Sequence, residues 1–142
     1  MTETAETSIL VAASPQSVWH ALTDPAAIAK YMYGTEVSTD WKKGSPIVYR
    51  GEWEGKPYED KGTILEIEPP RLLASSYYSP LSGKPDVPES YQNVTYTLAA
   101  EGSGTRVTVT QDGCADRAEA DRMAENWGMT LTGLKGVVEG SS

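Results

Sequence analysis

The end of the sequence carries the feature that most limits the fold. After Gly113 the chain continues as ADRAEADRMAENWGMTLTGLKGVVE, which contains no proline, and its apolar residues recur at helical spacing. At about 100° per residue, six of them fall on one narrow stripe. These six residues are Ala120, Met123, Trp127, Leu131, Leu134 and Val138. Because such a stripe must be buried against another element, the sequence predicts a long terminal helix packed on a sheet.

Three glycines interrupt this predicted helix. Gly128, Gly133 and Gly136 lie off the apolar stripe, so we expect none of them to be a close-packing contact. Each glycine costs about 1 kcal/mol relative to alanine inside a helix. The second half of the helix is therefore expected to be intrinsically weak.

The middle of the chain has a different period. From Gly34 onward apolar residues alternate, and glycine or proline separates the alternating runs at hairpin distances. This pattern predicts strands at 45–53, 58–68, 71–79, 93–101 and 105–111. A strand over 8–13 precedes two short helices that begin at Ser14-Pro15 and Asp24-Pro25, since serine caps helices and proline suits their first turn.

This order of elements predicts an α+β fold. A curved antiparallel sheet of six to seven strands wraps around the terminal helix, and two short helices follow the first strand. We expect one domain over 7–140, with disordered tails at 1–6 and 141–142. Where the curved sheet and the helix do not meet, an apolar gap able to hold a ligand remains. The proline-rich segment 79–90 is expected to be a mobile loop at its entrance.

Charge and composition exclude several classes of function. The net charge of −8 and the isoelectric point near 4.6 argue against nucleic acid and anionic membrane surfaces as partners. No apolar run approaches the roughly 20 residues of a membrane helix, and MTETAE lacks the parts of a signal peptide. We therefore expect a cytoplasmic protein without membrane insertion. One histidine and one cysteine predict no metal site, and no cofactor is expected.

Catalytic groups are not evident from the sequence. His20, the single histidine, is predicted on the solvent side of a short helix, which argues against a nucleophilic triad. Glu52, Asp60 and Glu66 lie in predicted strands and are expected on a solvated surface. Cys114 is expected to be an unreactive structural residue. We assign no catalytic residue.

The predicted inward positions are rich in aromatic side chains with polar tips. The candidate cavity residues are Tyr31, Tyr49, Trp53, Ser76, Tyr78, Tyr96, Gln111, Met123, Trp127, Leu131 and Leu134. Buried tyrosines usually complete a core and send their hydroxyls to water or a carbonyl. Core filling and cavity lining both fit this pattern, and the sequence does not decide between them.

Five segments in this order resemble the START-like, helix-grip (SRPBCC) superfamily, in the branch of activators of a heat-shock-protein ATPase (AHSA-type). They are SPQSVWHALTDPAAIAKYM, WKKGSPIVYRGEW, GTILEIEPPRLLASSY, GTRVTVTQDG and NWGMTLTGLK. The resemblance implies one domain whose apolar cavity is roofed by the last helix and, in many relatives, holds lipids, polyketides or other small hydrophobic molecules. Tyr31 stands where a tryptophan is usual, and Ala74 and Ser76 replace bulkier residues.

Three functions follow as hypotheses. The first is a small binding protein for a hydrophobic, aromatic or lipid-like molecule. The second is an enzyme of the cyclase, dehydratase or hydrolase kind that uses the same cavity. The third is an activator of a chaperone ATPase with a role in the stress response, although the chain offers no added partner-binding domain. Whether edge strands pair two copies into a homodimer is left open.

Overall fold

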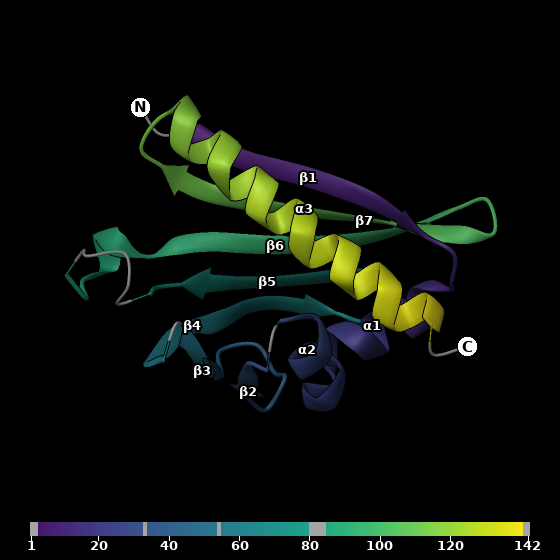
Figure 1. Ribbon diagram of the computed structural model, residues 1–142, viewed down its shortest axis with the longest axis horizontal. Coiled ribbons are helices and arrows are strands. Elements are labelled where there is room, and N and C mark those ends of the chain that lie inside the picture. Colours follow the sequence, from purple (N-terminus) through teal and green to yellow (C-terminus); the bar gives the residue numbers. More distant parts are fainter. Residues whose placement is uncertain (1–2, 33, 54, 80–84, 141–142) are drawn as a thin grey trace.

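The protein is a curved seven-stranded antiparallel sheet with one long helix across its concave face (Figure 1). The computed structural model describes residues 3–32, 34–53, 55–79 and 85–140, and only the backbone of Trp53. The strand order is β1-β7-β6-β5-β4-β3-β2. The strands are β1 (Glu3–Val11), β2 (Glu36–Ser38), β3 (Pro46–Trp53), β4 (Lys56–Glu68), β5 (Leu72–Tyr77), β6 (Gln92–Glu101) and β7 (Gly104–Cys114). The helices are α1 (Pro15–Thr23), α2 (Pro25–Tyr31), the short 3-10 turn η2 (Pro88–Ser90) and α3 (Arg117–Gly140).

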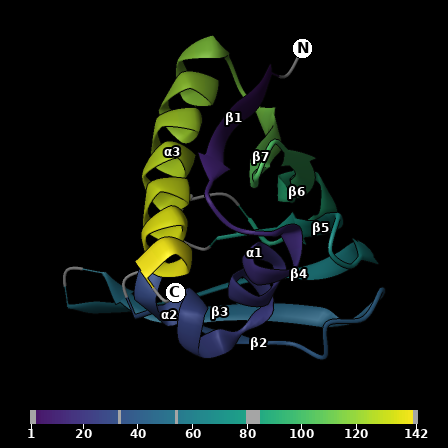
Figure 2. The same cartoon turned by 90° about the vertical axis from the view of Figure 1, so that its right-hand side faces the viewer.

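The curvature of the sheet is clearest from the side. In Figure 2, β1 and β7 run alongside α3, whereas β3 and β2 cross beneath its C-terminal end. The α+β architecture, the number of strands, the long terminal helix and the two short helices after β1 are confirmed. Among the described residues, no helix is long and apolar enough to cross a membrane.

The first strand begins earlier than the sequence suggests. β1 pairs with β7 from Glu3 onward, and Ala5 is fully buried against Cys114 and Ala120. The expectation of a disordered tail over 1–6 is therefore wrong for residues 3–6. Polar residues form this part of the strand because β7 supplies the main-chain partners, which no local pattern can show. Residues 1–2 and 141–142 lie outside the described residues.

The two short helices begin where proline and capping residues predict. The Ser14 hydroxyl accepts a 3.2 Å hydrogen bond from the Ser17 amide, and Pro15 opens α1. Pro25 opens α2, whose Tyr31 hydroxyl donates to the Ala21 carbonyl at 3.2 Å. This bond ties the two helices together, and both pack against α3.

The apolar stripe of α3 is buried along most of its length. Ala120, Leu131, Leu134 and Val138 are buried, and Met123 and Trp127 are half-buried. One expectation about the glycines is wrong. A β-carbon at Gly133 would lie 3.1 Å from Tyr31 Cβ, because α2 crosses α3 there, whereas a β-carbon at Gly128 or at Gly136 would meet no atom within 4 Å.

The side chains of β5 alternate one residue out of phase with the expectation. Leu73 and Ser75 are buried on the inward side, which the half-buried Tyr77 shares, whereas Ser76 and Tyr78 lie on the opposite side. A slip of one residue moves every side chain of a strand to the other face. The doublets in LLASSYY place an apolar residue on each face, so local alternation cannot choose between the two phases.

Candidate functional site

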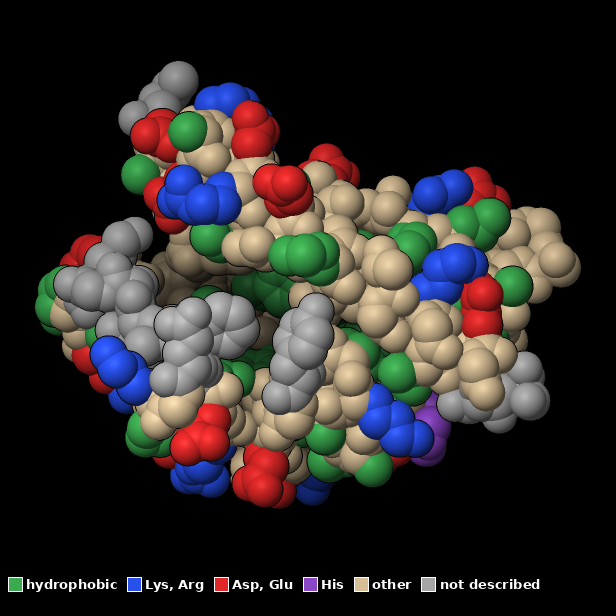
Figure 3. Space-filling model, in the orientation of Figure 1, with side chains coloured by type: hydrophobic (Ala, Val, Ile, Leu, Met, Phe, Trp, Pro, Cys, Tyr) green, Lys and Arg blue, Asp and Glu red, His purple; other side chains and the backbone are tan. Residues whose placement is uncertain are grey.

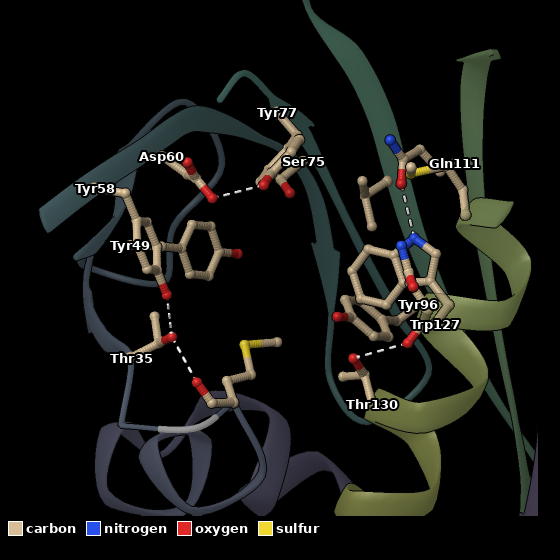
Figure 4. Close-up of a pocket in the computed structure, with 14 residues that line it drawn as sticks. Thr35, Tyr49, Tyr58, Asp60, Ser75, Tyr77, Tyr96, Gln111, Trp127 and Thr130 are labelled. Atoms are coloured by element: carbon tan, nitrogen blue, oxygen red, sulfur yellow. Dashed lines mark hydrogen bonds between the residues drawn. The ribbon is translucent and has the colours of Figure 1, made fainter. Parts of the chain in front are cut away.

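A cavity of about 280 Å³ lies between α3 and the concave face of the sheet. It is visible as a hollow with hydrophobic side chains at its floor in Figure 3 and in close-up in Figure 4. Its lining residues come from the segment between α2 and β2, from β3 to β7 and from α3. They are Met32, Thr35, Tyr49, Tyr58, Asp60, Ser75, Tyr77, Val94, Tyr96, Gln111, Met123, Asn126, Trp127 and Thr130.

The path of α3 explains why this space is not filled. The helix packs on β1 and β7 along one side and on α1 and α2 near its C-terminal end. The strands β3 to β5 curve away from it, so the middle of α3 faces them across the cavity (Figure 4). The apolar gap predicted between sheet and helix is therefore present.

One end of the cavity is built around Gln111. Trp127 Nε1 donates a 2.8 Å hydrogen bond to Gln111 Oε1, and Gln111 Nε2 donates a 2.7 Å bond to Gln92 Oε1. The Trp127 ring meets Tyr96 edge to face, with centroids 5.8 Å apart. Burial raises the pKa of Tyr96 well above its ordinary value. The two hydrogen bonds and the ring contact place the Gln111 amide and both rings side by side in one wall of the cavity (Figure 4).

The opposite end is built around a buried carboxylate. In the β3–β4 register Tyr49 faces Asp60, which places both side chains on the inner face. Asp60 is only 9% exposed, and its Oδ2 accepts a 2.6 Å hydrogen bond from the Tyr77 hydroxyl. Its Oδ1 is buried and has no hydrogen-bond partner among the residues that the structure describes. The expectation of a solvated Asp60 is wrong.

The alternation of β4 would have located this carboxylate. Tyr58, Gly62 and Ile64 share one face of the strand, and Asp60 stands between them on the same face. The preference of aspartate for water argues for exposure, but it is a weaker guide here. The alternation of side chains along β4 is the better guide, because neighbouring strands and α3 bury one whole face of the strand.

Three tyrosines, Tyr49, Tyr58 and Tyr77, lie at the Asp60 end of the cavity, and Tyr77 is the one that donates to the carboxylate (Figure 4). The rings of Tyr49 and Tyr77 meet edge to face, with centroids 6.4 Å apart. Burial, and then the charge of Asp60, raises the pKa of both phenols. The Tyr58 and Thr35 hydroxyl oxygens lie 2.6 Å apart. Since the Thr35 hydroxyl donates to the Met32 carbonyl, Tyr58 is the donor in that pair.

The structure brings together five of the candidate residues. Tyr49, Tyr96, Gln111, Met123 and Trp127 all line the cavity. The other candidates lie elsewhere: Tyr31, Leu131 and Leu134 are buried in the core, Ser76 and Tyr78 are on the far side of β5, and the side chain of Trp53 lies outside the described part of the chain.

Ser76 and Tyr78, which the sequence places at the cavity, have other partners in the structure. Ser76 Oγ accepts a 2.9 Å bond from the Thr63 amide, and Tyr78 stacks on Tyr91 at 5.2 Å between centroids. Their inward counterparts, Ser75 and Tyr77, were missed. Both could have been found by pairing β5 with β6, because Tyr77 faces Gln92 and Ser75 faces Val94 in that register.

Other ionisable candidates lie outside the cavity. Glu52 is exposed, and Glu66 pairs with Lys43 at 2.6 Å. His20 is exposed on α1. Cys114 is buried, and burial raises the pKa of its thiol. Within the described residues, no three metal-binding side chains gather at one point.

The fold and this cavity define a helix-grip domain with a largely apolar cavity between the sheet and its terminal helix. The chain belongs to the family of Activator of Hsp90 ATPase homolog 1-like proteins, whose model matches residues 12–139. The resemblance noted in the sequence is thereby confirmed. No curated protein sequence matches the chain.

Solved structures share this architecture over nearly the whole chain. A protein from Cytophaga hutchinsonii, whose structure was determined in solution, is 45% identical to this chain. Its TM-score is 0.85, over 98% of this chain and 95% of that one. CalU16 from Micromonospora echinospora is 23% identical, with a TM-score of 0.73 over 97% and 85% of the two chains. The Aha1 dimer from Colwellia psychrerythraea is 18% identical, with a TM-score of 0.75 over 96% of each. The last two show the fold alone.

Proposed function

We propose that the protein binds a small hydrophobic, aromatic molecule in the cavity between α3 and the sheet. The observation that carries this proposal is the cavity of about 280 Å³, which is walled by aromatic rings and has fixed polar groups at two ends. Ligand sites combine a mostly apolar wall with a few well-placed polar groups. Many members of the helix-grip superfamily hold molecules of this kind.

The walls suit a flat ligand of modest size. Tyr96 and Trp127 form an edge-to-face pair, which presents aromatic surface to a ring lying in the cavity. The Gln111 amide and the Tyr49 hydroxyl supply directional hydrogen bonds from opposite walls. Because pockets for drug-sized ligands begin at roughly 300 Å³, this volume favours compact one- or two-ring compounds over long lipids.

A thermal-shift screen of small aromatic compounds tests the proposal, since a ligand that binds only the folded state raises the melting temperature. The Val94→Phe variant introduces a ring at the cavity wall and should abolish the shifts, because Val94 lines the cavity. Thr97→Phe places the same ring on the exposed face of the same strand and should preserve them. Equal shifts in both variants, or no shift with any compound, would contradict binding at this site.

One observation favours a second candidate function. The buried Asp60, bonded to the Tyr77 hydroxyl inside the cavity, is the kind of group that transfers protons in enzymes of the cyclase, dehydratase or hydrolase kind. Compounds found by the screen can be incubated with the protein and followed by mass spectrometry. Conversion that Asp60→Asn abolishes without abolishing binding would support an enzyme, and absence of any conversion would leave binding alone.

A further inference from the structure

We infer that the ligand of this cavity carries a protonated amine, which pairs with the Asp60 carboxylate. This inference rests on the proposed binding function and names its ligand class. It follows from three features of the cavity: its charge, the unmet hydrogen-bonding capacity of Asp60, and the aromatic rings around that carboxylate.

The described lining carries one charged side chain, and that charge is negative. Asp60 lines the cavity, and no lysine, arginine or histidine is among the residues that line it. The neighbouring basic side chains are paired elsewhere. Arg50 bonds Glu59 at 2.7 Å, and Lys61 pairs with Asp86, both on the outside of the sheet. An anionic ligand would meet uncompensated repulsion here.

One oxygen of the carboxylate also lacks a hydrogen-bond donor among the described residues. The Tyr77 hydroxyl holds Oδ2 at 2.6 Å and so fixes the orientation of the group. No described residue donates to Oδ1, which is buried. A buried carboxylate with unfilled acceptor sites is costly unless a cation or further donors reach it. An ammonium group supplies both a compensating charge and three donors.

The rings at this end of the cavity suit a cation as well. Tyr49 and Tyr77 stand edge to face beside Asp60, and Tyr58 completes the wall (Figure 4). Tyrosine faces attract ammonium groups, and the attraction grows when water is excluded. The apolar part of the ligand then extends toward Tyr96 and Trp127 at the other end. A primary amine attached to a compact aromatic ring system fits this arrangement.

Three matched probes test the inference by calorimetry at neutral pH: 2-(1-naphthyl)ethylamine, 2-(1-naphthyl)ethanol and 1-naphthylacetate. They share one ring system and differ in being cationic, neutral and anionic. We expect the amine to bind about tenfold more tightly than the alcohol, because hydrogen bonds between charged groups are stronger than those of a neutral hydroxyl. The acid should bind most weakly.

Two variants test whether Asp60 causes the preference for the amine over the alcohol. Asp60→Asn should reduce the affinity for the amine to that for the alcohol, whereas Glu59→Gln makes the same change in net charge on the exposed face and should leave the preference intact. Circular dichroism and melting temperature verify that both variants fold, and the comparison of probes on the unchanged protein does not depend on either.

Each outcome has a distinct meaning. If the alcohol binds and the amine binds no better, the inference is overturned while the proposed binding function stands. A folded Asp60→Asn protein that keeps the tenfold preference also overturns it, because the preference then arises elsewhere. If none of the three probes binds, neither the amine inference nor the proposed binding of compact aromatic molecules survives.

Discussion

Gly133 of α3 lies against Tyr31 of α2 so closely that a β-carbon on the glycine would sit 3.1 Å from Tyr31 Cβ. Tyr31 has little freedom to move away, because it is buried and its hydroxyl is bonded to the Ala21 carbonyl. The close approach of the two helices at this point holds the C-terminal half of α3 beside α1 and α2. The middle of the same helix faces the cavity.

Alanine substitutions distinguish the effect of this contact on stability from the effect of helix propensity. Gly136→Ala places its methyl group in open space and should raise the free energy of unfolding by about 0.5–1 kcal/mol. Gly133→Ala gains the same propensity but must displace Tyr31, so its net effect should be zero or destabilising. Urea unfolding of both variants measures the difference, and an equal gain would show that no packing constraint exists at Gly133.

Gly62 marks a second close approach, between β4 and β5. A β-carbon there would lie 1.8 Å from the Ser76 carbonyl oxygen, which is backbone and cannot rotate aside. Gly62→Ala should therefore lower the free energy of unfolding by at least about 2 kcal/mol. Thr63→Ala, at the exposed neighbouring position, should change it by less than about 0.5 kcal/mol. Similar values for the two variants in denaturant titrations would contradict the close strand approach.

Trp127 should report ligand binding. Its indole lines the cavity and is bonded to Gln111, so a ligand that lies against it should change its fluorescence. Trp127→Phe should remove most of the ligand-induced change, whereas Trp19→Phe, in α1 outside the cavity lining, should retain it. A signal that survives in Trp127→Phe would place the ligand elsewhere.

We expect the free energy of unfolding to fall sharply in alkali because of four tyrosines with raised pKa values. Burial raises the pKa of Tyr31, Tyr49, Tyr77 and Tyr96 in the folded state. In the unfolded chain each phenol ionises near pH 10. The contribution of these tyrosines to the free energy of unfolding is therefore fully present below about pH 10. It is lost as the pH rises further, because the unfolded state then releases protons that the folded state keeps.

Tyrosinate absorbance and circular dichroism recorded together measure this effect. The buried phenols of Tyr31 and Tyr96 should ionise only as the protein unfolds, and Tyr96→Phe should make the loss of stability with pH shallower. Complete tyrosine ionisation in a protein that keeps its circular dichroism would contradict the burial of these groups.

Local sequence by itself determined the order and type of the elements. The 3.6-residue period of the last segment, the two-residue period of the middle and the helix starts at Pro15 and Pro25 are properties of neighbouring residues, and the structure has these elements where the patterns predict them. The inward positions of Tyr96 and Gln111 follow equally from uninterrupted alternation in β6 and β7.

Tertiary structure alone decided the remaining features. The polar start of β1, the phase of β5 and the contact of Gly133 with Tyr31 depend on partners far away in the chain. Asp60 also depends on the assembled fold, although the alternation of β4 already indicates which face of the strand it shares. Its own chemistry favours water, but the β3–β4 register and the curvature of the sheet carry it inward beside Tyr77. Burial is a property of the assembled layers, so a side chain's own preference for water could not settle where it lies.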